Sequence, residues 1–529
     1  VSGAPCIFLL RMGQKVSTFP AKPPDFPFFS LTFRLSDTML IVDASPEVAN
    51  LIRDCVLCSW PAGIQREYDE SNGVLQLKLN GIPFSRSCTR EHSVQTKKML
   101  CLILKTLRER GWELILSSDL SITYDLSTLF FQMVPVHGYN GCHIMCLSLS
   151  ALDKLQLVNA PDDAGRILME CVDDLYQKHT NAEDFFEVQM KGYLWSTATA
   201  EVGFRARQLL LDIFHRFHEL GYRYYGTANI KGTADCIFFI SDSDDVGTRE
   251  YCMLSLNASD RIRLIGAPDE VINVVGECLD RHWKRGVQDA KRRDGGAYFE
   301  YKLKGYPWHT WGTESVDSQL VLTIILQQLI TVGWAVVTAL DVSRRPTDKA
   351  VFLLRRCAIA SVPHFAICPA EADKVRVINA DKEINELVGN VLRDSWTLGI
   401  QREGLFGSSY EYKLVGYAWS ASSYNKQFEL CRMMMSRLLY QLAQRGWRVI
   451  CSADVSARYT SSDDHGSEEH PLDVHSWFVA YTGHAPASPP MQVLPSASGH
   501  VMPSVPPEEP PPSYESVMAG VGVMPIQKN

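Results

Sequence analysis

Hydrophobic and polar positions follow one succession that recurs along the chain: an alternating run, then a stretch of helical spacing. Alternation is typical of strands, and it occurs in MLIVDA (from Met39), LQLVNA (from Leu155), IRLIGA (from Ile262) and VRVINA (from Val375). A helical stretch follows each run and begins at Ser-Pro or Asp, as in SPEVANLIRDCVLCSW from Ser45. Acidic residues in the first turn suit the positive end of a helix dipole, so these stretches predict helices.

Three sequence blocks recur in register with this pattern. LKLNGIPF and its three counterparts place glycines at Gly81, Gly192, Gly305 and Gly416, which are 111, 113 and 111 residues apart. RERGWELIL and its counterparts place a second set at Gly111, Gly221, Gly333 and Gly446, which are 110, 112 and 113 residues apart. A third block, SWPAGIQRE from Ser59, returns from His282 and Ser395 and has decayed in the second copy. Three blocks in register indicate a tandem array.

Each copy predicts two strands, a helix, one strand, a long helix that ends at a glycine, and two further strands. The predicted fold is therefore α+β, a tandem array of four β-β-α-β-α-β-β units of about 110 residues. The recurrent Trp60, Trp283 and Trp396 are predicted to be buried near the second helix of their units. The predicted organisation is an N-terminal segment at 1–28, repeats at 29–136, 143–242, 250–357 and 364–482, and a disordered tail at 483–529.

The uncharged stretch SQLVLTIILQQLITVGWAVVTAL, residues 318–340, is long enough to suggest a transmembrane helix. In register with the other copies, however, it aligns with their helix, glycine and strand, and Gln327 and Gln328 fall in its middle. A helix that is apolar all round is also typical of burial between neighbours. We therefore predict a buried helix and a strand here.

The composition is that of a globular chain, with 46% hydrophobic and 21% charged residues. A net charge of −8, without a Lys/Arg stripe interleaved with aromatics, argues against nucleic-acid binding. Fifteen scattered cysteines without a reliable secretory signal predict reduced thiols and a cytoplasmic protein. Cys55 and Cys58 lie close together in a helical pattern, but no second pair follows at zinc spacing, so core packing is favoured over a metal site.

The residues that the copies share are mainly Gly, Trp, Tyr and Pro, with a recurring Asp at Asp119, Asp341 and Asp454 and Asn229 in the second copy. We interpret this Asp as a turn former at a strand end, with a ligand contact as the alternative. The Gln of the GIQ block (Gln65, Gln288, Gln401) is interpreted as satisfying a buried backbone group. Catalysis requires a nucleophile, an acid–base pair or metal ligands, and none of these repeats. The sequence thus predicts no catalytic residue, metal or cofactor, and it leaves the oligomeric state open.

Residues Met12 to Ser17 read MGQKVS, the pattern of N-myristoylation, in which Gly13 receives the acyl chain after Met12 is removed. The reaction requires a free glycine amine, so this hypothesis takes Met12 as the true start and the residues before it as a fragment or an over-extended translation. The alternative is an ordinary internal Met-Gly pair. Lys15 and Lys22 form no polybasic cluster, so one myristoyl chain predicts reversible attachment to a membrane surface.

The composition changes at Gly483: 11 of the last 47 residues are Pro and the periodicity disappears, which is typical of disorder. This tail contains a P-P-x-Y motif at Pro511, Pro512 and Tyr514. Prolines preset a polyproline II helix, so little entropy is lost when such a segment docks in an aromatic-lined groove. The motif resembles the ligands of WW-domain proteins, the HECT-type ubiquitin ligases of the Nedd4 class.

The GIQ and KLxGxPW blocks resemble uncharacterised animal and fungal proteins over roughly residues 29–482, and this resemblance implies no activity. The two ends resemble membrane-attached adaptors that recruit such ligases to the plasma membrane or to endosomes. We therefore expect a non-enzymatic, peripherally membrane-attached adaptor or scaffold. The alternative is an enzyme or small-ligand-binding repeat protein with a site between repeats. A deep polar pocket with convergent titratable groups would favour this alternative, and flat or grooved surfaces would favour the adaptor.

Overall fold

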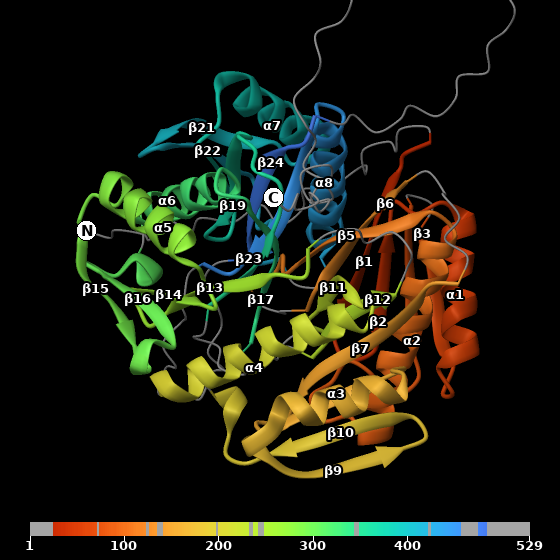
Figure 1. Ribbon diagram of the computed structural model, residues 1–529. Coiled ribbons are helices and arrows are strands. Elements are labelled where there is room, and N and C mark those ends of the chain that lie inside the picture. The colour runs from red at the N-terminus through yellow and green to blue at the C-terminus, as the bar shows by residue number, and fades with distance from the viewer. Residues whose placement is uncertain are drawn as a thin grey trace, which may run out of the picture.

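The structure, a computed structural model, contains four α+β units that follow one another along the chain (Figure 1). Each unit has one six-stranded sheet and two long helices. The fold class predicted from the sequence is confirmed. The described residues are 25–483, except 71–72, 123–125, 135–140, 197–198, 232–235, 242–247, 311, 343–348, 422–424 and 456–473.

The first two units have the same order of elements, apart from short 3-10 turns. The first unit consists of β1 (Phe28–Arg34), β2 (Thr38–Val42), α1 (Pro46–Ser59), β3 (Ile64–Glu70), β4 (Val74–Leu79), α2 (Arg90–Glu109), β5 (Trp112–Ser118) and β6 (Thr128–Met133). The second consists of β7 (His143–Ser150), β8 (Lys154–Val158), α3 (Asp162–Val172), η1 (Asp173–Leu175), β9 (Tyr176–Ala182), β10 (Phe185–Met190), η2 (Leu194–Ser196), α4 (Ala200–Glu219), β11 (Arg223–Ala228) and β12 (Cys236–Ser241).

The last two units repeat this order. The third consists of β13 (Tyr251–Asn257), β14 (Arg261–Ile265), α5 (Asp269–His282), β15 (Val287–Arg293), η3 (Asp294–Gly296), β16 (Tyr298–Leu303), η4 (Pro307–His309), α6 (Thr313–Ile330), β17 (Trp334–Leu340) and β18 (Val351–Arg356). The fourth consists of β19 (His364–Ala370), β20 (Lys374–Ile378), α7 (Lys382–Ser395), β21 (Ile400–Phe406), β22 (Ser409–Leu414), α8 (Lys426–Ala443), β23 (Trp447–Ala453) and β24 (Ser476–Tyr481).

All four sheets are antiparallel and have equivalent strand orders, β3-β4-β2-β1-β6-β5 in the first unit. Each unit therefore has one strand more than the sequence predicted, because the GIQ block forms the edge strands β3, β9, β15 and β21. These strands lie at the solvent side of the sheet, and in β9 six of seven residues are exposed. A strand that buries neither face shows no hydrophobic alternation, which is why the pattern did not reveal it.

The helix boundaries follow the signals in the sequence. Asp381 caps α7, since its carboxylate accepts the main-chain N–H of Ile384 at 2.8 Å, and Ser45 caps α1 in the same way at 3.4 Å. Gly111 follows α2 with a φ of 82°, and its three counterparts also have positive φ. The predicted glycine caps of the second helices are confirmed, because this conformation favours a residue without a Cβ.

The uncharged stretch at 318–340 contains most of α6, the glycine cap and β17, as predicted. Of the helices in the described part of the chain, none has both the length and the apolar composition that crossing a bilayer demands. α6 is apolar all round because it packs against β17 of its own unit and β19 of the next. Gln327 serves this second contact, since its side-chain oxygen accepts the main-chain N–H of His364 at 3.2 Å.

The four units form a closed ring in which the second helix of each packs against the sheet of the next. α2 packs against β7, α4 against β13, α6 against β19, and α8 returns to β1. All seven residues of β1 are buried, because the two faces of the strand enter different cores. Phe29 and Phe131 point into the core of unit 1, whereas Phe28 and Phe130 join the core of unit 4.

The inner edge strands β5, β11, β17 and β23 meet in the middle of the ring. Direct contacts between side chains join them: the Tyr224 hydroxyl lies 2.8 Å from the Thr338 hydroxyl, and the Ser452 hydroxyl donates to that of Ser118 at 2.8 Å. Each inner strand also carries a β-bulge, as at Ile115 in β5, which bends the strand locally.

β11 packs closely against β5 at Gly226. A Cβ at this position would lie only 2.3 Å from Cδ2 of Leu114. We expect Gly226→Ala to lower the free energy of unfolding by about 1–3 kcal/mol, because overpacking forces the buried Leu114 from its rotamer. Denaturant unfolding measures this effect. In a Leu114→Ala background the same substitution should cost less than half as much, and additive costs would contradict the explanation.

Candidate functional site

The tryptophans of the repeat blocks are buried, as predicted: Trp60, Trp283 and Trp396 are 1%, 4% and 0% exposed. Each lies in the same core cluster as the second helix of its unit, and the Trp60 ring centroid lies 5.3 Å from that of His92 in α2. The indole N–H groups donate at 2.9–3.0 Å to the main-chain oxygens of Asn80, Lys304 and Val415. These residues precede the first set of recurrent glycines, so the blocks hold one structural corner in three units.

The interpretation of Gln65, Gln288 and Gln401 was wrong. All three side chains are exposed, and each residue sits at a β-bulge of its edge strand. A bulge leaves one residue of the strand without a partner across the ladder. Because these three side chains are exposed to water, they do not satisfy a buried backbone group.

The recurring Asp lies at the end of each inner edge strand and marks a junction between units. The main-chain oxygen of Asn229 accepts the N–H of Ser127 from unit 1 at 2.8 Å. Equivalent bonds join Ala350 to Asp454 at 3.0 Å and His475 to Asp119 at 3.2 Å. The Asp119 carboxylate also accepts from the Ser127 hydroxyl at 2.9 Å. These contacts favour the interpretation of this Asp as a turn former. They also show that its main-chain oxygen accepts a hydrogen bond from a neighbouring unit.

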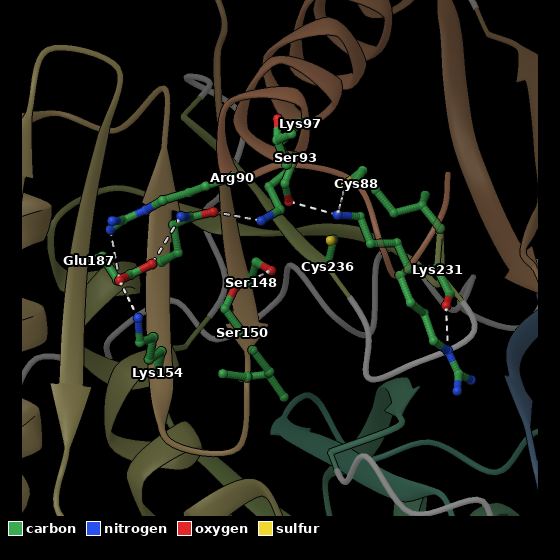
Figure 2. A pocket seen from close by; sticks show the side chains of 16 residues that line it. Cys88, Arg90, Ser93, Lys97, Ser148, Ser150, Lys154, Glu187, Lys231 and Cys236 are labelled. Atoms are coloured by element: carbon green, nitrogen blue, oxygen red, sulfur yellow. Dashed lines mark hydrogen bonds and ion pairs between the residues drawn. The ribbon is translucent and has the colours of Figure 1, made fainter. Parts of the chain in front are cut away.

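A cavity of about 380 Å³ lies between units 1 and 2 (Figure 2). Unit 1 contributes the start of α2 and the residues before it, and unit 2 contributes β7, β8, β10, β12 and the residues after β11. The lining includes the hydroxyl groups of Ser93, Ser148 and Ser150, five basic side chains and one carboxylate. The charged residues are Arg86, Arg90, Lys97, Lys154, Glu187 and Lys231.

Hydrogen bonds connect the cavity wall across the junction. Glu187 Oε1 accepts from Arg90 at 2.8 Å and from Lys154 at 3.0 Å, and its Oε2 accepts from the Gln156 amide at 3.2 Å. The oxygen of that amide accepts from the Lys97 ammonium at 2.6 Å. Glu187 therefore compensates Arg90 and Lys154, while Lys97 has a neutral partner.

Lys231 approaches the other end of the cavity from unit 2. Its ammonium group donates to the Ser93 hydroxyl and lies close to the Cys88 sulfur, both at 2.8 Å. In the described part of the chain, neither Lys97 nor Lys231 lies within ion-pair distance of a carboxylate. The junction thus holds two amines whose direct partners are an amide, a hydroxyl and a cysteine sulfur.

Burial sets the electrostatics of this wall. Lys97 is 2% exposed, and burial lowers its pKa, with the positive charge of Lys231 acting in the same direction. Cys236 lies beside them, and a hydrogen bond from the Cys146 thiol lowers the pKa of Cys236 below that of an ordinary thiol, with Lys97 adding to the effect. The site consequently favours negative charge.

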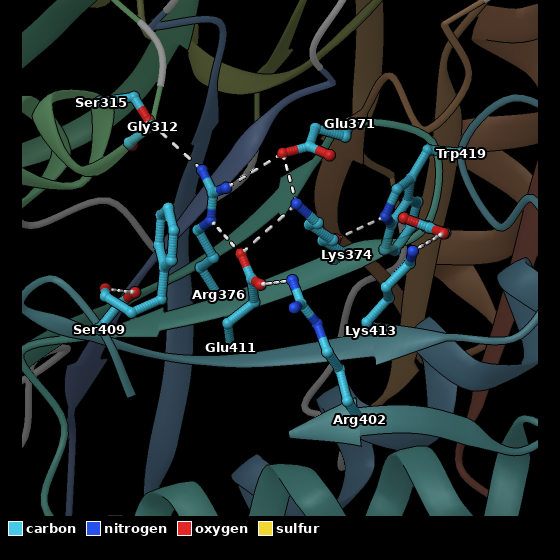
Figure 3. Close-up of polar contacts among 12 residues, drawn as sticks. Gly312, Ser315, Glu371, Lys374, Arg376, Arg402, Ser409, Glu411, Lys413 and Trp419 are labelled. Atoms are coloured by element: carbon cyan, nitrogen blue, oxygen red, sulfur yellow. Dashed lines mark hydrogen bonds and ion pairs between the residues drawn. The ribbon is translucent and has the colours of Figure 1, made fainter. Parts of the chain in front are cut away.

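The corresponding place between units 3 and 4 is built differently (Figure 3). Arg376, in the position of Gln156, pairs with Glu411 at 2.9 Å and reaches the Ser315 hydroxyl at 3.3 Å. Lys374, in the position of Lys154, pairs with Glu371 at 2.6 Å. At the junction between units 2 and 3, the Glu300 carboxylate similarly forms ion pairs with Arg261, Arg263 and Arg293. Carboxylates therefore compensate these cations within the protein itself.

Sequence reasoning did not identify the cavity residues. Lys97 lies in the run TKKM of a helix that also packs on the next unit, and nothing in the run separates a buried lysine from an exposed one. Lys231 and Cys236 come from another unit, next to residues outside the described part. The residues that the sequence did single out, Gly13 and the P-P-x-Y motif at Pro511, Pro512 and Tyr514, also lie outside the described residues.

The cysteines in the described part are free, and Cys55 is buried in the core while Cys58 is exposed. The core interpretation of this pair thus applies to Cys55 alone. In the same part of the chain, no group of three or more His, Cys, Asp or Glu side chains is placed to share a metal ion.

Comparison with known proteins supports the division into units. One domain-family model matches the chain four times, at residues 27–132, 143–245, 250–355 and 363–479. The matches cover more than half of the chain, and one falls on each unit of the ring. A comparison with curated proteins finds no match.

The contrast between Trp396 and Gln401 in one block gives a test of these roles. Trp396→Phe should lower the free energy of unfolding by about 1–3 kcal/mol, because the Val415 oxygen loses its buried donor. Gln401→Ala, in the exposed bulge, should change it by less than about 0.5 kcal/mol. Chemical denaturation of the two variants measures the difference, and equal costs would contradict the assignment.

Proposed function

The chain belongs to the family defined by this repeated domain, and we propose that it acts as a non-enzymatic, membrane-attached adaptor. In this proposal the ring is a rigid scaffold, a myristoyl group on Gly13 attaches it to the plasma membrane or to endosomes, and the P-P-x-Y motif recruits WW-domain ligases of the Nedd4 type. The residues that recur in the units support a scaffold, because their contacts serve turns, cores and junctions rather than a reaction.

The observation that carries the proposal is the place at which the two chain ends leave the ring. At the N-terminal side, the Phe26 ring packs against Tyr440 of α8, with 5.2 Å between centroids. At the C-terminal side, the N–H of Thr482 donates at 2.7 Å to the oxygen of Gly446, which follows the C-terminal end of α8. Both ends thus leave at the C-terminal end of one helix, so a lipid on one segment would hold the motif on the other near the membrane.

The proposed membrane attachment is weak because it rests on one acyl chain. One myristoyl chain gives only marginal, reversible membrane binding, and stable attachment needs a second signal. A bound membrane protein or a bound ligase could provide this signal. The adaptor would then be retained at the membrane mainly when its partners are present.

Lipidation gives the first test of this proposal. A chain that starts at Met12 should incorporate a myristate analogue in cells, and Gly13→Ala should abolish the incorporation because the acyl acceptor is lost. A chain that keeps residues 1–11 ahead of Met12 in an uncleaved form is the matched control and should remain unlabelled. Labelling of the Gly13→Ala variant would contradict the proposed site.

Recruitment by the tail is the second prediction. In a peptide of residues 505–520, Tyr514→Ala should weaken binding to WW domains by about 1–3 kcal/mol, because the ring no longer fills its pocket. Pro512→Ala should also weaken it, since groove contact and preorganisation are lost. Ser513→Ala is the matched control, because this position is unrestricted in the motif. Calorimetric titration compares the peptides.

Phosphorylation of Tyr514 should oppose the same interaction, because a phosphate dianion would lose its hydration in the aromatic pocket. The full-length chain should show the same ranking of variants in a WW-domain pull-down. Equal binding of the parent and Tyr514→Ala chains, or no binding of either across a representative set of WW domains, would refute recruitment through this motif.

A further inference from the structure

In the described part of the chain, the junction between units 1 and 2 holds a cavity lined by two amines, Lys97 and Lys231, that have no carboxylate within ion-pair distance. Lys97 and Lys231 contact the Gln156 amide, the Ser93 hydroxyl and the Cys88 sulfur, none of which is a carboxylate. Moving an ammonium group from water into a protein is costly unless an anion or several hydrogen bonds compensate it. The described lining of the cavity has five basic side chains and one carboxylate, Glu187, so its excess of positive charge favours an anion.

At the equivalent helix position, units 2 and 4 carry an arginine and unit 3 carries Gln319. Arg207 of α4 donates to the Gly203 oxygen at 2.9 Å and to the Ser255 hydroxyl at 2.7 Å. Arg432 of α8 lies over the Phe428 ring, 3.4 Å from its centroid, and donates to the Phe428 oxygen at 3.1 Å. Both arginines donate to a main-chain oxygen of their own helix, whereas the Lys97 ammonium donates across the junction to Gln156 at the wall of a cavity.

The groups around the cavity match one ligand chemistry. Arg90 and the two lysines supply donors for a compact anion, and Ser93 adds a hydroxyl. The cavity also borders the N-terminus of α2, a 20-residue helix whose N–H groups and dipole favour negative charge. Arginine and lysine together with a helix N-terminus are the usual recognition elements for a phosphoryl group.

Size limits the rest of the ligand. A volume of about 380 Å³ lies at the lower end of the range for small-molecule pockets, so it accommodates a phosphoryl group and a small organic part. We propose that the junction between units 1 and 2 binds the phosphoryl group of a small phosphomonoester, with Lys97 and Lys231 as its principal charged contacts. A convergent polar pocket of this kind favours the small-ligand alternative for this junction, and the inference does not depend on the adaptor function.

The test is calorimetric titration of the full-length chain with glycerol 3-phosphate and, separately, with inorganic phosphate, against chloride at equal ionic strength. Lys231→Met and Lys97→Met should each weaken binding about tenfold or more, because each removes one charged hydrogen bond. Lys374→Met is the matched control, since this lysine already has a carboxylate partner at the equivalent junction, and it should leave binding unchanged. Thermal unfolding of each variant verifies that it is folded.

A second arm distinguishes a free phosphomonoester from a lipid headgroup. Vesicles containing phosphatidic acid, which exposes the same group, are compared with vesicles of phosphatidylcholine alone. Binding to phosphatidic acid that depends on Lys231 would assign the site to a lipid and still support phosphoryl recognition. No binding in either arm at millimolar phosphomonoester, or binding that both lysine substitutions leave intact, would overturn the proposal. If Lys97→Met does not fold, Lys231→Met alone decides, because Lys231 is only half-buried.

Discussion

The structure depends on the burial of both faces of the central strands in every sheet. In each unit the two helices cover one face, and the second helix of the preceding unit covers the other. A central strand such as β1 accordingly buries every one of its residues, and each large apolar side chain removed from water stabilises the fold by about 1.5–3 kcal/mol. A single unit would expose a whole apolar face. Closure of the ring supplies the missing cover for unit 1, since α8 packs onto β1.

This constraint explains why the recurrent residues are structural. The buried tryptophans and the glycines that follow them hold the corner of the edge hairpin in three units, and Asp119, Asn229 and Asp454 offer their main-chain oxygens to a neighbouring unit. Positions that must serve every junction cannot be specialised for one ligand. Specific chemistry is therefore expected where the junctions differ, as in the contrast between Lys97 with its cavity and Arg376 with its carboxylates.

The ring also relates the two ends of the chain. Units 1 and 4 are the most distant in sequence, yet α8 and β1 are packed together, so the segments that precede Phe26 and follow Thr482 begin near one helix end. A lipid and a partner-binding motif attached there would act at the same side of the scaffold. The cavity between units 1 and 2 is built from other elements, so ligand binding and recruitment can coexist in one chain.

Much of the architecture could be predicted from the sequence because it rests on local chemistry. Alternation revealed the buried strands, the recurrent glycines revealed the helix ends, and the apolar character of α6 revealed burial between neighbours. The edge strands were missed because a strand such as β9 is exposed on both faces and carries no alternation. Because the edge strand was not recognised, Gln401 was expected to satisfy a buried backbone group, whereas it is exposed at a bulge of that strand.

The sequence by itself determined four units, their α+β class and the position of most elements, since periodicity and caps act within a few neighbouring residues. Only the tertiary structure decided that the array closes into a ring, and that Lys97 and Lys231 meet at one cavity. Closure depends on which face of each helix meets the next sheet, and the meeting of two lysines depends on how two units are oriented. Both arrangements involve residues that are far apart in the sequence, so the spacing of residues along the chain does not reveal them.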